Sequence, residues 1–170
     1  MAISEERKTY ISLLATGGIF DNLSSEESDA FTEDDCDRPY REFFASVTDP
    51  EELHVFASFY NWDGGDHDLL QVLHHPLCDL GTALLIYWRS QPGFYLEYRN
   101  FEEVGPAFED GWHLLRKIEG MVAAGSFRTS TQPFDPANDE GEDLRPNPEE
   151  IRRHGQDIPP AMYRAVKPKS

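Results

Sequence analysis

A buried central helix is predicted by the stretch Asp79-Leu80-Gly81-Thr82-Ala83-Leu84-Leu85-Ile86-Tyr87-Trp88-Arg89. Nearly every side chain from Leu80 to Trp88 is apolar, so a helix formed here has no polar face to turn toward water. Asp79 can cap its N-terminus by accepting hydrogen bonds from the first free backbone amides. Gly81 and Ala83 are small enough to let a neighbouring backbone approach closely. We therefore expect this helix to lie at the centre of the fold.

Helical spacing and capping residues extend on both sides of this stretch. They indicate further helices over residues 4–15, from about 39 to 47, and over 50–60, 66–74 and 106–124. The clearest start is Asp49-Pro50-Glu51-Glu52, where Asp49 and Glu52 fit a capping box and Pro50 fits the first helical turn. Residues 94–98 and 127–134 are candidates for short extended segments. The sequence thus predicts an all-α fold, a compact bundle of about six helices.

Prolines divide the chain into two parts. Its 170 residues match the size of one ordinary domain, but seven of the 12 prolines lie after residue 126. We expect a helical body over residues 1–125. A Pro-rich, irregular C-terminal extension over residues 126–170 is expected to pack on that body or trail from it.

The charge balance points to a basic partner. The chain has 32 acidic and 15 basic residues, for a net charge of −17. Such a field repels phosphate backbones and anionic lipid, so neither nucleic acid nor a membrane is an expected partner. Eight of the acids lie between Asp21 and Asp37, where there is no Lys or Arg. A protein with a basic surface would relieve this repulsion and associate quickly.

Hydropathy and cysteine usage predict a cytoplasmic protein. No apolar run approaches the roughly 18 residues needed to cross a bilayer, and no secretory signal is visible at the N-terminus. Cys36 and Cys78 form neither a CxxC pair nor a disulfide framework. We therefore expect them to be free thiols in a reducing compartment.

A polar cluster in the middle of the chain raises the possibility of metal chemistry. Histidine and carboxylate side chains are metal ligands, and a metal-bound water is a ready nucleophile. The spacing fits neither a calcium loop nor an HExxH site. Helix caps and exposed histidines explain the cluster better, and we predict no catalytic residue, metal or cofactor. The cluster comprises Asp63, Asp66, His67, Asp68, His74, His75 and Asp79.

The candidate partner-binding residues combine acidic side chains with one tryptophan. Trp62 lies in a turn between two helices, where it is either an exposed anchor or a core side chain folded under the turn. Tryptophan is enriched in the hot spots of protein interfaces. The candidates are Glu26, Glu27, Asp29, Glu33, Asp34, Asp35, Asp37, Trp62, Asp63 and Asp66.

Two strings in the centre of the chain resemble a known signature. They are Tyr60-Asn61-Trp62-Asp63-Gly64 and Cys78-Asp79-Leu80-Gly81-Thr82-Ala83-Leu84-Leu85, with Tyr87-Trp88 after them. They resemble a bacterial family of unknown function, over about residues 53–100. The resemblance implies a small cytoplasmic protein, encoded in some members beside secreted polymorphic toxins. It also implies that the whole chain is similar to a type VI secretion immunity protein against a nuclease effector. It supplies no catalytic residues.

Three functions remain open at this point. The first is an immunity protein that binds and neutralises a cognate toxin with a basic surface, as a monomer or a homodimer. The second is a metal-dependent hydrolase that uses His67, His74 or His75 with Asp63 or Asp79. The third is a non-enzymatic adaptor subunit of a larger complex. The charge distribution and the resemblance favour the first.

Overall fold

Helices dominate the molecule. The computed structural model describes residues 3–21, 24, 30, 32–62 and 65–167, and this part of the chain contains seven α-helices and no β-strand. The predicted all-α fold is confirmed. The helices are α1 (Glu5–Thr16), α3 (Glu33–Ser46), α4 (Pro50–Phe59), α5 (His67–His74), α6 (Leu80–Arg89), α7 (Glu109–Ala123) and α8 (Pro148–His154).

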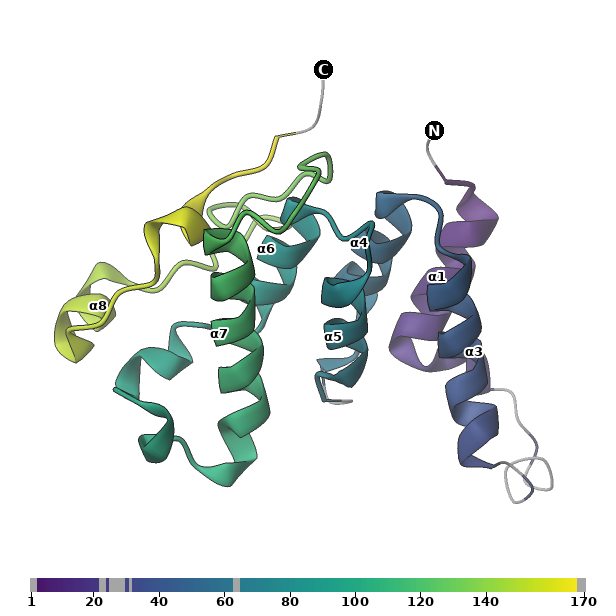
Figure 1. Cartoon of the computed structure of the whole chain (residues 1–170), viewed down its shortest axis with the longest axis horizontal. Helices are drawn as coiled ribbons and strands as arrows, with labels where there is room; N and C mark the ends of the chain where they lie inside the picture. Colours follow the sequence, from purple (N-terminus) through teal and green to yellow (C-terminus); the bar gives the residue numbers. More distant parts are fainter. Residues whose placement is uncertain (1–2, 22–23, 25–29, 31, 63–64, 168–170) are drawn as a thin grey trace.

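The helices form a row with α6 near its centre (Figure 1). Helix α1 packs against α4, α4 against α6, and α6 against α7, while α5 also contacts α4. Residues 81–88 of α6 are all buried, which is the placement expected of a helix without a polar face. Asp79 caps this helix by accepting a hydrogen bond from the Gly81 amide at 2.8 Å.

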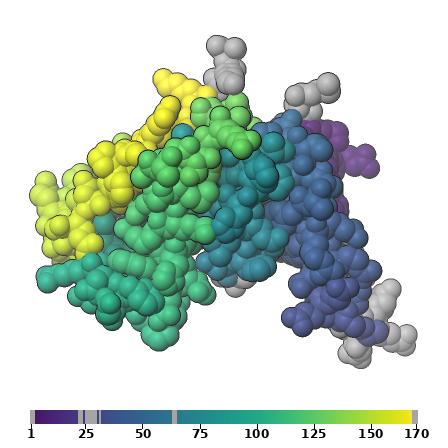
Figure 2. Space-filling view, viewed as in Figure 1, coloured from purple at the N-terminus to yellow at the C-terminus, as the bar shows by residue number. Residues whose placement is uncertain are grey.

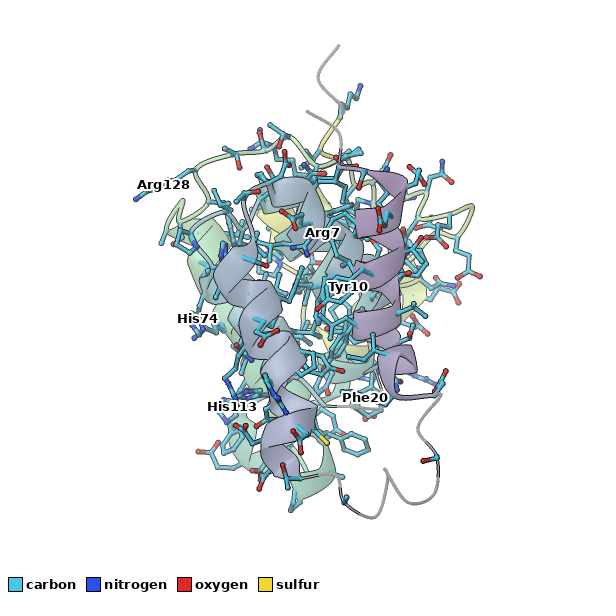
Figure 3. All side chains as sticks on the ribbon, turned by 90° about the vertical axis from the view of Figure 1, so that its right-hand side faces the viewer. Arg7, Tyr10, Phe20, His74, His113 and Arg128 are labelled. Atoms are coloured by element: carbon cyan, nitrogen blue, oxygen red, sulfur yellow. The ribbon has the colours of Figure 1, made fainter. Side chains whose placement is uncertain are left out.

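An ion pair joins the N-terminal helices. Nε of Arg7 donates to Oε2 of Glu52 at 2.6 Å, and the Arg7 guanidinium lies over the rings of Tyr10 and Phe43. Burial opposes the charge on Glu52, but hydrogen bonds from backbone amides and from Arg7 outweigh it and lower the pKa of the carboxyl. Figure 3 shows Arg7 and Tyr10 where α1 faces α3. One guanidinium thus links α1, α3 and α4.

Helix α3 begins six residues earlier than the sequence predicts. We expected a start near Pro39, but the helix runs from Glu33 and contains Pro39. Thr32 and Asp35 form a capping box at its start, and three acidic residues in the first turn interact favourably with the helix dipole. These local interactions compensate for the backbone hydrogen bond that the proline cannot make.

Residues 94–98 are helical rather than extended. They contain a 3₁₀ helix, Phe94–Glu97, the segment called η3, followed by the short turns η4 (Phe101–Glu103) and η5 (Pro106–Phe108) before α7. An extended segment needs a partner strand to satisfy its backbone groups. Within the described residues there is none, and η3 closes its hydrogen bonds locally.

Residues 126–167 pack against the helical body through α6. Asp79 is fully buried and accepts hydrogen bonds from the amides of Thr131 and Gln132 at 2.6 and 3.2 Å. A Cβ atom on Gly81 would lie only 1.9 Å from the Gln132 carbonyl oxygen. Asp79 and Gly81 therefore hold the extension against the start of α6, a contact that we call the Asp79 clasp.

The other end of α6 carries a second attachment. Arg89 donates to both carboxylate oxygens of Asp139 at 2.8 and 3.1 Å, and also to the backbone oxygen of Ser58. The Trp88 indole N–H donates to the Met162 carbonyl at 2.8 Å. The extension is more regular than predicted, because it includes α8 and the 3₁₀ turn η6 (Pro160–Tyr163).

None of the helices in the described ranges is both long enough and apolar enough to span a bilayer. Both cysteines are free thiols, Cys36 exposed and Cys78 buried. Burial raises the pKa of the Cys78 thiol to about 12. Cys78 therefore stays protonated and acts as a small apolar side chain.

Candidate partner-binding face

A groove opens between α3 and α5 on the face seen in Figure 2. It has a volume of about 760 Å³, and the end of α1 and residues 60–61 complete its walls. We call it the acidic groove, defined by Asp37 and Tyr40 from α3, Tyr60, and His67 and Asp68 from α5. Its walls thus combine carboxylates with aromatic rings.

Tyrosine hydroxyls fix the walls of the acidic groove. Tyr40 donates to the Leu14 carbonyl at 3.0 Å and so ties α3 to α1. Tyr60 donates to the Gly65 carbonyl at 3.1 Å and so holds the turn before α5. Burial raises the pKa of both phenols, and Asp68 raises it further. Both remain neutral donors at physiological pH, so the groove is built on fixed side chains.

The electrostatics of the acidic groove disfavour further negative charge. Burial raises the pKa of Asp68, and the carboxylate of Asp37 adds to that effect. The cation on the same wall, Arg41, is engaged by Asp34 at 2.6 Å. A cationic side chain placed in the groove would relieve the repulsion between Asp37 and Asp68.

The structure separates the acidic candidates into groups. Glu33, Asp34, Asp35 and Asp37 lie on the first turns of α3, and of these Asp37 lines the acidic groove. Asp34 pairs with Arg41 and Asp35 with Arg38, because both arginines follow the acidic run closely on the same helix. Four other acidic candidates, Glu26, Glu27, Asp29 and Asp63, lie outside the described residues.

Trp62 is exposed, so of the two alternatives for this side chain the surface position is the observed one. Its ring packs edge-on against Tyr60, with the centroids 5.8 Å apart, and 36% of its surface remains accessible. Asp66 occupies the N-cap position of α5 without a side-chain capping bond, so its expected role as a cap is not seen.

Two exposed aromatic side chains that the sequence did not single out lie near Trp62. Phe94 and Phe108 line one cavity with it. The sequence offered one signal for Phe94, because this aromatic residue directly follows the turn Gln91-Pro92-Gly93. Phe94 and Phe108 lie close to Trp62 because of the path of residues 90–108, which join α6 to α7.

The central His/Asp cluster is dispersed. Asp79 is committed to the extension, and Nδ1 of His75 accepts from the Leu77 amide at 3.2 Å. His74 is exposed, and Figure 3 shows it at the edge of the molecule. In the part of the chain that is described, no three His, Cys, Asp or Glu side chains are grouped to hold a metal ion.

One half-buried histidine was missed by the sequence analysis. His54 on α4 lines a cavity of about 360 Å³ between the body and the extension, together with Arg89 and Asp139. Its Nδ1 lies 3.1 Å from the Thr82 hydroxyl. Burial lowers the pKa of His54 to about 4, and Asp79 opposes the shift. The imidazole is therefore neutral at physiological pH, and it lines the cavity between the body and the extension.

Comparisons with known proteins find similarity for the central helices of the chain. No curated protein and no solved structure matches the chain. A family model does match, over residues 48–123, which run from just before the α4 cap to the end of α7. The match leaves out α1, α3 and the extension. Residues 48–123 are similar to the family described as "Domain of unknown function (DUF4274)".

Proposed function

We propose that this protein is an immunity protein that binds and neutralises a cognate secreted toxin by forming a complex with it. The toxin is a nuclease effector of a type VI secretion system, and the complex forms in the cytoplasm. The protein performs no chemistry of its own in this role. Its contact surface includes the acidic groove.

The observation that carries the proposal is the pair Asp37 and Asp68 in an open groove with fixed aromatic walls. Two carboxylates that face one cavity and raise each other's free energy favour a cation between them. Tyr40, which is half-buried, offers ring surface to the apolar stem of a Lys or Arg side chain. A basic protein segment therefore fits this groove in both charge and shape.

A nuclease supplies such a segment. It must hold a polyanionic substrate, so its substrate cleft carries Lys and Arg side chains. An antidote with a net charge of −17 is attracted to that cleft at long range, which raises the association rate constant above the unsteered value of about 10⁵–10⁶ M⁻¹s⁻¹. Rapid capture suits an inhibitor whose target damages the cell catalytically.

The proposal expects a large secreted effector to be encoded beside this gene, and the test is co-expression of that effector with this protein. Cells that carry the wild-type protein should survive induction of the effector, and cells without it should die. Reversal of the groove charges by Asp37→Lys with Asp68→Lys should abolish protection, because the partner's cations would then meet like charge. Circular dichroism and a thermal melt of the purified variant confirm that it is folded.

A matched control changes the same number of charges elsewhere. Glu6 on α1 and Glu42 on α3 are exposed and do not line the groove. The variant Glu6→Lys with Glu42→Lys should still protect. Full protection by the groove variant would remove the acidic groove from the interface. Failure of the wild-type protein to protect would overturn the proposed function itself.

A further inference from the structure

Three exposed aromatic rings surround one cavity beside the acidic groove. Trp62, Phe94 and Phe108 line a cavity of about 280 Å³, with 36, 42 and 43% of their surfaces accessible. The rings of Phe94 and Phe108 lie 5.0 Å apart between centroids. We call these three residues the aromatic surface. So much accessible ring area at one place is typical of an interface rather than of free surface.

The aromatic surface is held in place by the fold. Tyr95 of η3 is buried. A Cβ atom on Gly111 of α7 would lie 2.1 Å from the Tyr95 hydroxyl oxygen. This close approach fixes η3, with Phe94, against the start of α7. Trp62 rests on Tyr60. Because these rings are positioned before any partner arrives, binding loses little side-chain entropy.

Two carboxylates act electrostatically on Tyr95, which also lines this cavity. Asp66 and Asp110 lie near one another and near Tyr95. Burial raises the pKa of Asp66, and the nearby Asp110 adds to that effect. Burial also raises the pKa of Tyr95, and Asp110 and Asp66 raise it further. Arg89, the cation on the inner wall of the cavity, is engaged by Asp139 and Glu140. The aromatic surface therefore lies close to two carboxylates, and His67 and His113 are the basic groups near Asp66.

We infer that the aromatic surface docks a protein segment in which an apolar or aromatic side chain is flanked by Lys or Arg. The apolar side chain enters the cavity between Trp62 and Phe108. The flanking cations face Asp66 and Asp110 and lie over the ring faces. The inference rests on the proposed function for the sign of the partner's charge, and it adds a second contact separate from the acidic groove.

The test uses the full-length, ¹⁵N-labelled protein and three synthetic hexapeptides as probes. The first is acetyl-Lys-Arg-Leu-Trp-Arg-Lys-amide, the second replaces Leu-Trp by Ser-Ser, and the third replaces the four cations by Glu. The first peptide should shift the Trp62 indole signal and the amides of Phe94 and Phe108. The second and third should leave them in place, since each lacks one half of the required chemistry.

Two substitutions quantify the contribution of the rings. Trp62→Ala and Phe108→Ala should each weaken binding of the first peptide by about tenfold or more, as for the central residues of an interface. The matched control is Phe59→Ala, because Phe59 is also an exposed aromatic, at 53%, and does not line the cavity. Thermal melts establish that all three variants are folded.

The possible outcomes separate this inference from the proposed function. Shifts confined to Asp37, Tyr40 and Asp68 would overturn the aromatic docking site and leave the acidic groove as the contact. Equal binding of the Ser-Ser peptide would show charge attraction alone and would also overturn it. Absence of any shift with the first peptide overturns it as well. The proposed function is judged independently, by survival in co-expression.

Discussion

Asp79 and Gly81 stabilise the fold, although Asp79 was also a candidate residue of the metal-dependent hydrolase. The Asp79 carboxylate accepts from the amides of Gly81, Thr131 and Gln132. Its hydrogen-bonding capacity is spent inside the fold, so it is not available to a metal or a substrate. Within the string that includes Trp62, by contrast, the tryptophan remains accessible. The string around Asp79 therefore serves the fold, whereas Trp62 has accessible ring surface.

The Asp79 clasp predicts a strong effect of a single methyl group. Gly81→Ala places a Cβ atom against the Gln132 carbonyl and should destabilise the protein by about 1–3 kcal/mol, the usual cost of overpacking. The control is Gly120→Ala in α7, where a Cβ would meet nothing within 4 Å. That change should stabilise the protein by up to about 1 kcal/mol, because alanine is the better helix former. Urea unfolding followed by circular dichroism measures both, and equal stability of the two variants would contradict the clasp.

His54 predicts how stability depends on pH. Its folded pKa of about 4 lies below its ordinary value of 6.5, so the unfolded chain takes up a proton first as the pH falls. The stabilisation from neutral His54 is complete above pH 6.5 and is lost progressively toward pH 4. Between pH 7 and pH 5 the free energy of unfolding should fall by about 2 kcal/mol.

A pair of variants isolates this histidine. His54→Asn should remove most of the pH dependence between pH 7 and pH 5, because asparagine does not titrate. His74→Gln changes an exposed histidine and should leave the dependence intact. Chemical unfolding at a series of pH values measures the difference. A slope that persists in the His54→Asn variant would contradict a neutral, half-buried imidazole.

At the scale of elements, local signals predicted helices well and their boundaries less well. The caps at Asp49 and Asp79 are present as predicted, because a cap depends on residues a few positions apart. The start of α3 was misplaced, since a proline in the interior was read as a start. The segment η3 was misassigned, because an aromatic run does not reveal whether a partner strand exists.

Arg89 joins α6 to the extension, so its removal should weaken the attachment of the extension to the body. Arg89→Ala leaves Asp139 without its cation in a nearly buried site, with 13% of the Asp139 side chain exposed. The protein should lose about 2 kcal/mol or more, and residues 135–145 should become more sensitive to protease. Arg145→Ala is the control, because its partner Asp143 is half exposed and exposed ion pairs contribute little to stability. Similar cleavage rates in the two variants would contradict the role of Arg89.

On the scale of the whole molecule, the site comes from segments far apart in the sequence. The sequence predicted the acidic composition of α3 and singled out Trp62, because charge runs and turn residues are local features. It could not predict that Asp37 faces Asp68, or that Trp62 shares a cavity with Phe94 and Phe108. Those neighbours are set by the packing of α3, α5 and the α6–α7 connection, which has no local signature.

The matched family domain covers only part of this arrangement. Residues 48–123 include Asp68 and the whole aromatic surface, whereas Asp37 comes from α3, which precedes the match. The Asp79 clasp likewise joins a residue inside the match to Thr131 outside it. In this protein the flanking segments therefore complete both the fold and the proposed contact face.

The central claim is that a negatively charged face captures a positively charged protein, and the salt dependence of association tests it most directly. The measurement is the association rate constant of the purified protein with the purified effector, by stopped-flow fluorescence. Between about 0.05 M and about 0.5 M salt this constant should fall by about tenfold or more, as screening removes long-range attraction. The variant Asp37→Lys with Asp68→Lys should associate slowly even at low salt, while Glu6→Lys with Glu42→Lys should associate faster than it does. A rate constant that is insensitive to salt and equal in all three proteins would contradict the account.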